Sequence, residues 1–188
     1  MAADGPKSAV EGIIAAVDNA DADAFEKNMD ITSVARHVFT ELETMGKMPE
    51  YSGQMPPILS LLINQNAFTN PVTQEILLSE VRKFVRYGVG SGAFAGKKVE
   101  NYKGESMMAP LFSLISMGKK EITRIETPVK TEDGRHVVPF AVVDHENGNT
   151  YYVRAIVTQE GNSWKITDIQ NIRFLIQQIL LESAATEA

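Results

Sequence analysis

The hydrophobic pattern of the chain changes its period near residue 119. Before this point, apolar residues recur three and four positions apart, the spacing that places them on one face of a helix. The first run, "GPKSAVEGIIAAVDNAD", has this spacing at Val10, Ile13, Ile14 and Val17. From Lys119 onward apolar and polar residues alternate, which is the period of a β-strand. The pattern predicts a mainly helical half, residues 1–118, followed by a sheet.

Further helical runs follow the first one, several with a residue suited to a helix end. Asp21 or Asp23 can cap a short helix. The next run, "DITSVARHVFTELETMG", has predicted inward residues at Ile31, Val34, Val38 and Leu42. Asn70 and Pro71 suit the start of a longer helix. Its predicted inward residues are Ile76, Leu77, Val81, Phe84 and Val85. "PPILSLLINQNAF" and "SMMAPLFSLISMG" predict two short apolar helices.

Four strand-like runs rich in Val, Ile, Thr and Tyr occupy residues 119–170. They are "KEITRIETPVKTE", "RHVVPFAVVDHE", "NTYYVRAIVTQ" and "NSWKITDIQ", separated by "EDG", "ENGN" and "EGN". Turns this short make consecutive strands antiparallel, so we expect a four-stranded meander. Pro139 has no N–H for a strand ladder and predicts a bulge or an edge, which would curve the sheet.

An apolar helix is expected within residues 171–184, after the last strand. Its stripe consists of Ile172, Leu175, Ile176 and Ile179. Helices first, then a curved meander, then this closing helix predict an α+β fold with the helical half packed on the sheet. The chain of 188 residues is expected to form one domain, 1–188.

The two central strands have apolar residues on both faces, whereas a sheet with one wet face alternates cleanly. Either both faces are covered by a filled core, or one face lines an apolar cavity at the open end of a cone-shaped sheet. The residues leave both readings open. If the cavity exists, the residues predicted to line or guard it are Phe140, Tyr152, Arg154 and Trp164.

Arg154 lies in the middle of a predicted strand, and its environment decides its role. A buried guanidinium needs a partner, which Asp144, Asp168, or a ligand carboxylate or phosphate can supply. On an outward face it is an ordinary surface residue. Both readings remain open at this point.

Composition excludes several classes of function. The hydrophobic content of 44% and charged content of 22% are typical of a folded protein. The net charge of -6 argues against nucleic-acid binding, which needs a surplus of Lys and Arg on one face. The absence of cysteine excludes disulfides, thiol nucleophiles and cysteine-ligated metals. No apolar run approaches the length of a transmembrane segment.

Motifs for catalysis and for cofactors are weak. The three histidines are far apart in sequence, so no metal site and no cofactor are predicted. "GVGSGAFAG" lacks the Gly-Lys-Ser/Thr ending of a phosphate loop. "DHE", residues 144–146, could pair a carboxylate with an imidazole, but it leads into a turn, which favours a solvated hairpin end. No catalytic residue is predicted.

The beginning of the chain, "MAADGPKSAV", has neither a basic leader nor an apolar signal region. Small residues followed by "DGP" are typical of the segment just after a signal-peptidase cut. We therefore expect an exported protein, periplasmic in a bacterium, with a cytoplasmic location as the alternative.

Several segments carry a family resemblance. A helical half, a meander and the "WKITDI" strand resemble the nuclear transport factor 2-like (cystatin-like) α+β superfamily. More narrowly, the order "FVRYGVGSGAF", "NYKGES", "WKITDI" and "IRFLIQQIL" is similar to bacterial periplasmic phospholipid-carrier proteins of the toluene-tolerance family. The resemblance covers most of residues 70–182. It implies a cone-shaped sheet with a pocket for an apolar ligand.

The predicted function is non-enzymatic binding of an apolar or amphipathic small molecule, of which a lipid is the most specific version. One alternative is a protein-interaction module that forms a homodimer through the outer sheet face or the Met-rich helix around Met107, Met108 and Met117. The other is a small isomerase or hydrolase of the same superfamily, which needs a carboxylate such as Asp144 or Asp168 facing a cavity.

Overall fold

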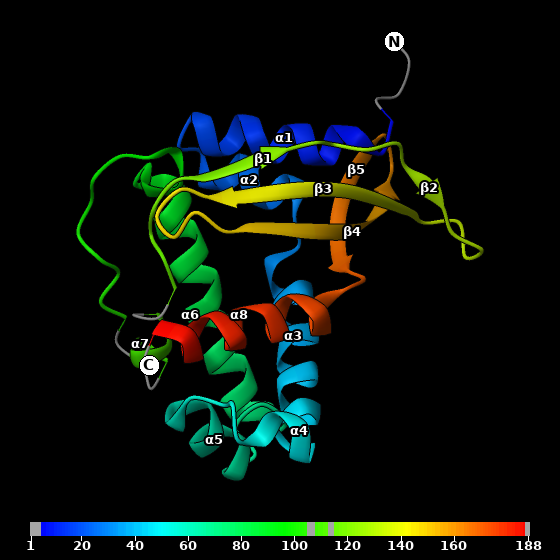
Figure 1. Ribbon diagram of the computed structural model, residues 1–188. Helices are drawn as coiled ribbons and strands as arrows, with labels where there is room; N and C mark the ends of the chain where they lie inside the picture. Colours follow the sequence, from blue (N-terminus) through cyan, green and yellow to red (C-terminus); the bar gives the residue numbers. More distant parts are fainter. Residues whose placement is uncertain (1–4, 105–107, 113–114, 187–188) are drawn as a thin grey trace.

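The computed structural model describes residues 5–104, 108–112 and 115–186, and has the predicted α+β fold (Figure 1). The helices of the first part are α1 (Lys7–Asp18), α2 (Ala22–Asn28), α3 (Ile31–Gly46), α4 (Pro49–Ser52), α5 (Pro57–Asn64), α6 (Pro71–Gly90) and α7 (Ala109–Phe112), with a 3-10 turn at Ala93–Ala95. The strands are β1 (Lys120–Thr123), β2 (Val129–Lys130), β3 (His136–Asp144), β4 (Thr150–Glu160) and β5 (Ser163–Ile169). Helix α8 (Ile172–Thr186) follows the sheet, as predicted.

Helix starts follow from side-chain caps that the sequence indicates. The carboxylate of Asp21 accepts a hydrogen bond from the backbone N–H of Ala24 and caps α2. The side chain of Asn70 accepts from the N–H groups of Val72 and Thr73 and caps α6. These bonds satisfy N–H groups that have no partner within the helix. The predicted cap Asn70 is confirmed, and of the two alternatives Asp21 and Asp23 the cap is Asp21.

The buried faces of two helices differ from the predicted ones. On α3 the most buried stripe is Ile31, Ala35, Phe39 and Glu43, while the predicted Val34, Val38 and Leu42 are only half-buried. On α6 the prediction that Ile76 faces inward is wrong, because its side chain is 53% exposed. Periodicity identifies an apolar stripe, but the neighbouring helices decide which part of it is covered.

The sheet is antiparallel, with the strand order β1-β3-β4-β5 and with β2 also beside β3. The first predicted run is therefore two strands rather than one. Strand β1 pairs with β3 from Ala141 to Asp144, and β2 pairs with Val137 and His136. The interval lies opposite Pro139, which has no N–H to offer a neighbouring strand. The register shift of the sheet lies instead between β4 and β5, at Ile156 and Val157.

Two hydrophobic clusters make up the core. One packs the β3, β4 and β5 residues Val138, Phe140, Val153, Val157 and Ile166 against α1 and α2. The other lies between α3, α5, α6 and α8 and includes Phe39, Phe68, Leu62, Leu77 and Leu180. The side chains of Val81, Val85 and Phe94 pack against both clusters. The core therefore extends from the sheet to the helices below it in Figure 1.

Substitution of Gly88 by alanine tests how closely α6 packs against the ring of Phe94. A β-carbon at Gly88 would lie 2.2 Å from the Cζ atom of Phe94, whose ring is held between the two clusters. Overpacking of this kind outweighs the helix propensity gained, so we expect Gly88→Ala to lower the free energy of unfolding by about 1–2 kcal/mol. Urea denaturation followed by circular dichroism measures this change.

Gly53→Ala is the matched control for Gly88→Ala. Gly53 has a φ of -74°, and no heavy atom lies within 4 Å of the position of a β-carbon there. We expect its effect to stay within about 0.5 kcal/mol. Equal stability of the two variants would contradict the packing described for Gly88.

Candidate functional site

A groove of about 880 Å³ lies between the C-terminal part of α8 and the β3–β4 hairpin end. In Figure 1 the last turns of α8 (red) lie below the end of the β3–β4 hairpin, at the left. Its apolar wall is formed by Tyr102, Phe112, Ile115, Met117, Val142 and Ile179. Its polar lining includes Lys120, Asp144, Glu146, Asn147, Tyr151 and Glu182. Apolar and polar side chains thus meet in one hollow.

Lys120 and Asp144 form the best-buried ion pair in the lining. The β1–β3 register places the two residues directly opposite each other, and the Lys120 Nζ atom lies 3.1 Å from Asp144 Oδ2. Asp144 is only 4% exposed. A carboxylate this buried needs a countercharge and hydrogen bonds to offset the loss of hydration. The pairing thus follows directly from the strand register.

Ser116 links this ion pair to the hairpin turn. Lys120 donates to Ser116 Oγ at 2.9 Å and to the Gly118 carbonyl at 3.0 Å. The Ser116 hydroxyl lies within hydrogen-bonding distance of carboxylate oxygens of both Asp144 and Glu146. Glu146 also accepts from the Gly118 N–H. The cluster fixes the segment before β1 against the β3–β4 turn.

Tyr151 and Glu182 connect β4 with α8 on the other side of the groove. The Tyr151 hydroxyl donates to Glu182 Oε2 at 2.6 Å and accepts from the side-chain N–H of Asn147 at 3.2 Å. Burial, and then the hydrogen bond to Glu182, raise the pKa of the Tyr151 hydroxyl above its usual value. The phenol therefore stays protonated and holds the Glu182 side chain at the groove.

The four predicted ligand residues are not brought together. Phe140 is buried against α1 and α2, and Trp164 packs at the edge of the same cluster with its ring 5.1 Å from His136. Tyr152 is 55% exposed on the opposite face of the sheet, and Arg154 is exposed on that face too. The described lining of the groove includes none of the four. Their role in ligand binding remains a prediction.

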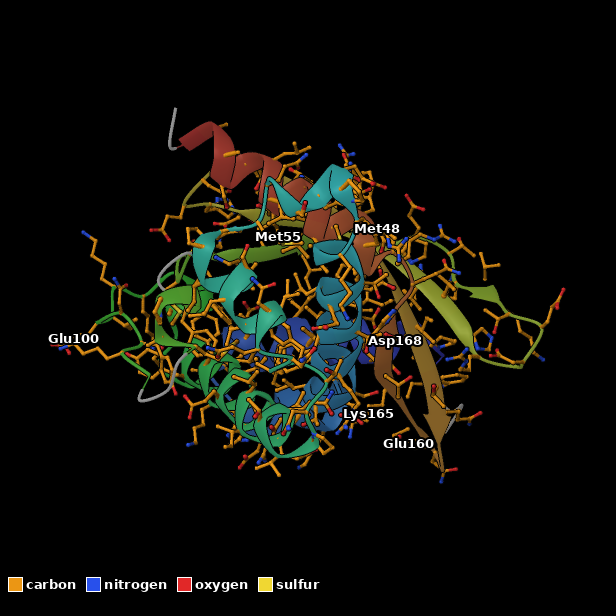
Figure 2. All side chains as sticks on the ribbon, turned by 90° about the horizontal axis from the view of Figure 1, so that it is seen from below. Met48, Met55, Glu100, Glu160, Lys165 and Asp168 are labelled. Atoms are coloured by element: carbon orange, nitrogen blue, oxygen red, sulfur yellow. The ribbon has the colours of Figure 1, made fainter. Side chains whose placement is uncertain are left out.

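The carboxylates suggested as partners of Arg154 bind other groups. Arg154 Nε donates to Gln170 Oε1 at 2.7 Å, while Asp144 pairs with Lys120. Asp168, labelled on β5 beside α3 in Figure 2, lies 2.6 Å from His37 Nδ1. Of the two interpretations of Arg154, the structure therefore agrees with an exposed residue on the outward face of the sheet.

Comparison with protein-family models, with curated proteins and with solved structures found no match to this chain. Within residues 5–104, 108–112 and 115–186, no helix has the length and apolar character needed to cross a membrane. The described part of the chain likewise contains no group of three or more His, Cys, Asp or Glu side chains placed to hold a metal ion.

Sequence patterns missed most of the groove, although two signals pointed near it. "DHE" contributes Asp144 and Glu146 to the lining, but His145 instead pairs with Glu121 at 2.6 Å and lowers the pKa of that carboxyl. Of the methionine cluster, Met117 lines the groove, Met108 is buried, and Met107 lies outside the described residues. No sequence motif marked the other polar lining residues Ser116, Lys120, Tyr151 and Glu182.

Proposed function

We propose that the protein binds an amphipathic small molecule with a single hydrocarbon chain in the groove between α8 and the β3–β4 hairpin. The observation that carries this proposal is the division of the lining into an apolar wall and a hydrogen-bonded polar part. Such a hollow buries a hydrocarbon chain on one side and satisfies a polar head group on the other.

Two further features support the proposal. The groove volume of about 880 Å³ falls within the range of small-molecule sites in proteins. Met117 supplies a flexible, polarisable side chain to the apolar wall, which suits chains of varying shape. The sequence resemblance to nuclear transport factor 2-like proteins and to exported phospholipid carriers favours the same class of function. A cone-shaped sheet and a periplasmic location, both expected from the sequence, are further parts of what we propose.

Calorimetric titration with octan-1-ol tests the proposal with a neutral ligand that stays below micelle-forming conditions. We expect a dissociation constant on the order of 0.1–1 mM for a ligand of this size. Ile179→Glu places a charge on the apolar wall at a side chain that is already 50% exposed, so the fold should tolerate it. Binding should weaken by about tenfold or more.

Ile76→Glu is the matched control, because Ile76 has nearly the same exposed fraction, lies on α6 and is not among the described lining residues. This variant should bind octan-1-ol like the wild-type protein. Equal loss in both variants, or no binding by the wild-type protein, would contradict the proposal. If octan-1-ol does not bind and the mass measured by sedimentation rises with concentration, the homodimer alternative takes its place.

A further inference from the structure

Carboxylates outnumber cations in the described lining of the groove. Its described lining carries one cation, Lys120, and three carboxylates, those of Asp144, Glu146 and Glu182. Lys120 is already paired with Asp144, the most buried of the three. Glu146 and Glu182 lie on two sides of the groove, one after β3 and the other on α8. Among the described lining residues, carboxylates therefore outnumber cations, and a ligand there meets a surplus of negative charge.

Hydrogen bonds hold both carboxylates at the groove. Glu146 accepts from the Gly118 N–H at 2.9 Å. Glu182 accepts from the Tyr151 hydroxyl and from the side chain of Gln178. These groups present acceptor oxygens beside an apolar wall.

We infer that the groove selects a cationic amphiphile, a single-chain amine whose ammonium group lies among Glu146, Glu182 and Asn147. This inference rests on the proposed function and specifies its ligand class. An ammonium gains attraction from the surplus carboxylates, and its N–H groups match the acceptors. An anionic head group such as a carboxylate or phosphate meets repulsion there. Arg154, the residue suggested as a partner for such a group, is not among the described lining residues.

Three ligands of equal chain length test the inference: octylammonium, octan-1-ol and octanoate at neutral pH. We expect octylammonium to bind about tenfold more tightly than octan-1-ol, and octanoate more weakly than octan-1-ol. In about 1 M NaCl, where the Debye length is about 3 Å, the preference should shrink to about threefold or less.

Removal of the charges of exposed Glu146 and half-buried Glu182 provides the second part of this test. The double variant Glu146→Gln/Glu182→Gln keeps the acceptor oxygens but removes the surplus charge, and it should lose most of the octylammonium preference. Glu11→Gln changes the net charge on an exposed position of α1, away from the described lining, and should keep the preference.

The outcomes separate the inference from the function on which it rests. Binding of all three ligands with similar affinity, or tighter binding of octanoate, would overturn the cation preference and leave groove binding intact. Binding of none of them would overturn both. A preference for octylammonium that survives the double variant would place the cation elsewhere and overturn the inference.

Discussion

Lys120→Met lowers the free energy of unfolding by about 3 kcal/mol, as we expect from breaking a buried ion pair on one side. The variant leaves Asp144 4% exposed without its countercharge, and it removes the donor to Ser116 and to the Gly118 carbonyl. The methionine side chain has nearly the length of lysine, so packing is largely kept. Urea denaturation monitored by circular dichroism gives the change from the transition midpoint.

The neighbouring lysine provides the control for Lys120→Met. Lys119 is exposed, and its Nζ atom lies 3.8 Å from the exposed carboxylate of Glu121. Exposed pairs contribute little because water screens them, so Lys119→Met should change stability by no more than about 0.5 kcal/mol. Equal effects of the two substitutions would show that the Asp144 pair is not buried as described.

Phe68→Ala should lower the free energy of unfolding by about 3–5 kcal/mol, the range for removal of a buried aromatic ring. Phe68 is 1% exposed, and its ring centroid lies 4.9 Å from that of Phe39 on α3. The cavity left in the helical cluster would be lined by side chains fixed on several helices, which limits collapse. The same urea transition measures the loss.

Phe174→Ala is the control for Phe68→Ala, because it removes the same ring from a side chain that is 57% exposed on α8. Its effect should stay within about 0.5 kcal/mol. Phe68 is not among the described lining residues of the groove, so folded Phe68→Ala protein should bind octan-1-ol like the wild-type protein. A small loss for Phe68→Ala would contradict the helical core described above.

Local physics explains why the elements of this fold could be predicted. The spacing of Val10 and Ile13 gives α1, and the side chains of Asp21 and Asn70 begin α2 and α6 through bonds within three residues of themselves. The short turns make consecutive strands antiparallel. Each of these signals acts over a few residues, so no knowledge of distant contacts was needed.

Tertiary contacts decided the features that the sequence patterns missed. Pro139 is one irregular position in the sequence, and only the strand pairing places it opposite the interval between β1 and β2. Phe140 and Tyr152 lie on opposite faces because Phe140 pairs with Val153, and a register shift by one residue would exchange the faces. Strand register is set by the whole sheet and cannot be read from one strand.

The groove could not be predicted for the same reason. Ser116 precedes β1, Tyr151 begins β4, and Glu182 lies near the end of α8, so their proximity depends on strand pairing and on the placement of α8. None of these residues has a spacing typical of a site. The lysine–aspartate pair of β1 and β3 becomes visible only once the register is known.

Methyl NMR during titration with octan-1-ol is the most direct test of ligand binding in the groove. We expect the largest shift changes at Ile115, Val142 and Ile179, which line the groove, and little change at Val72 and Ile76 on α6. The shifts should saturate with the dissociation constant found by calorimetry. Saturating shifts centred on α6, or unchanged methyl signals at Ile115, Val142 and Ile179, would contradict binding in this groove.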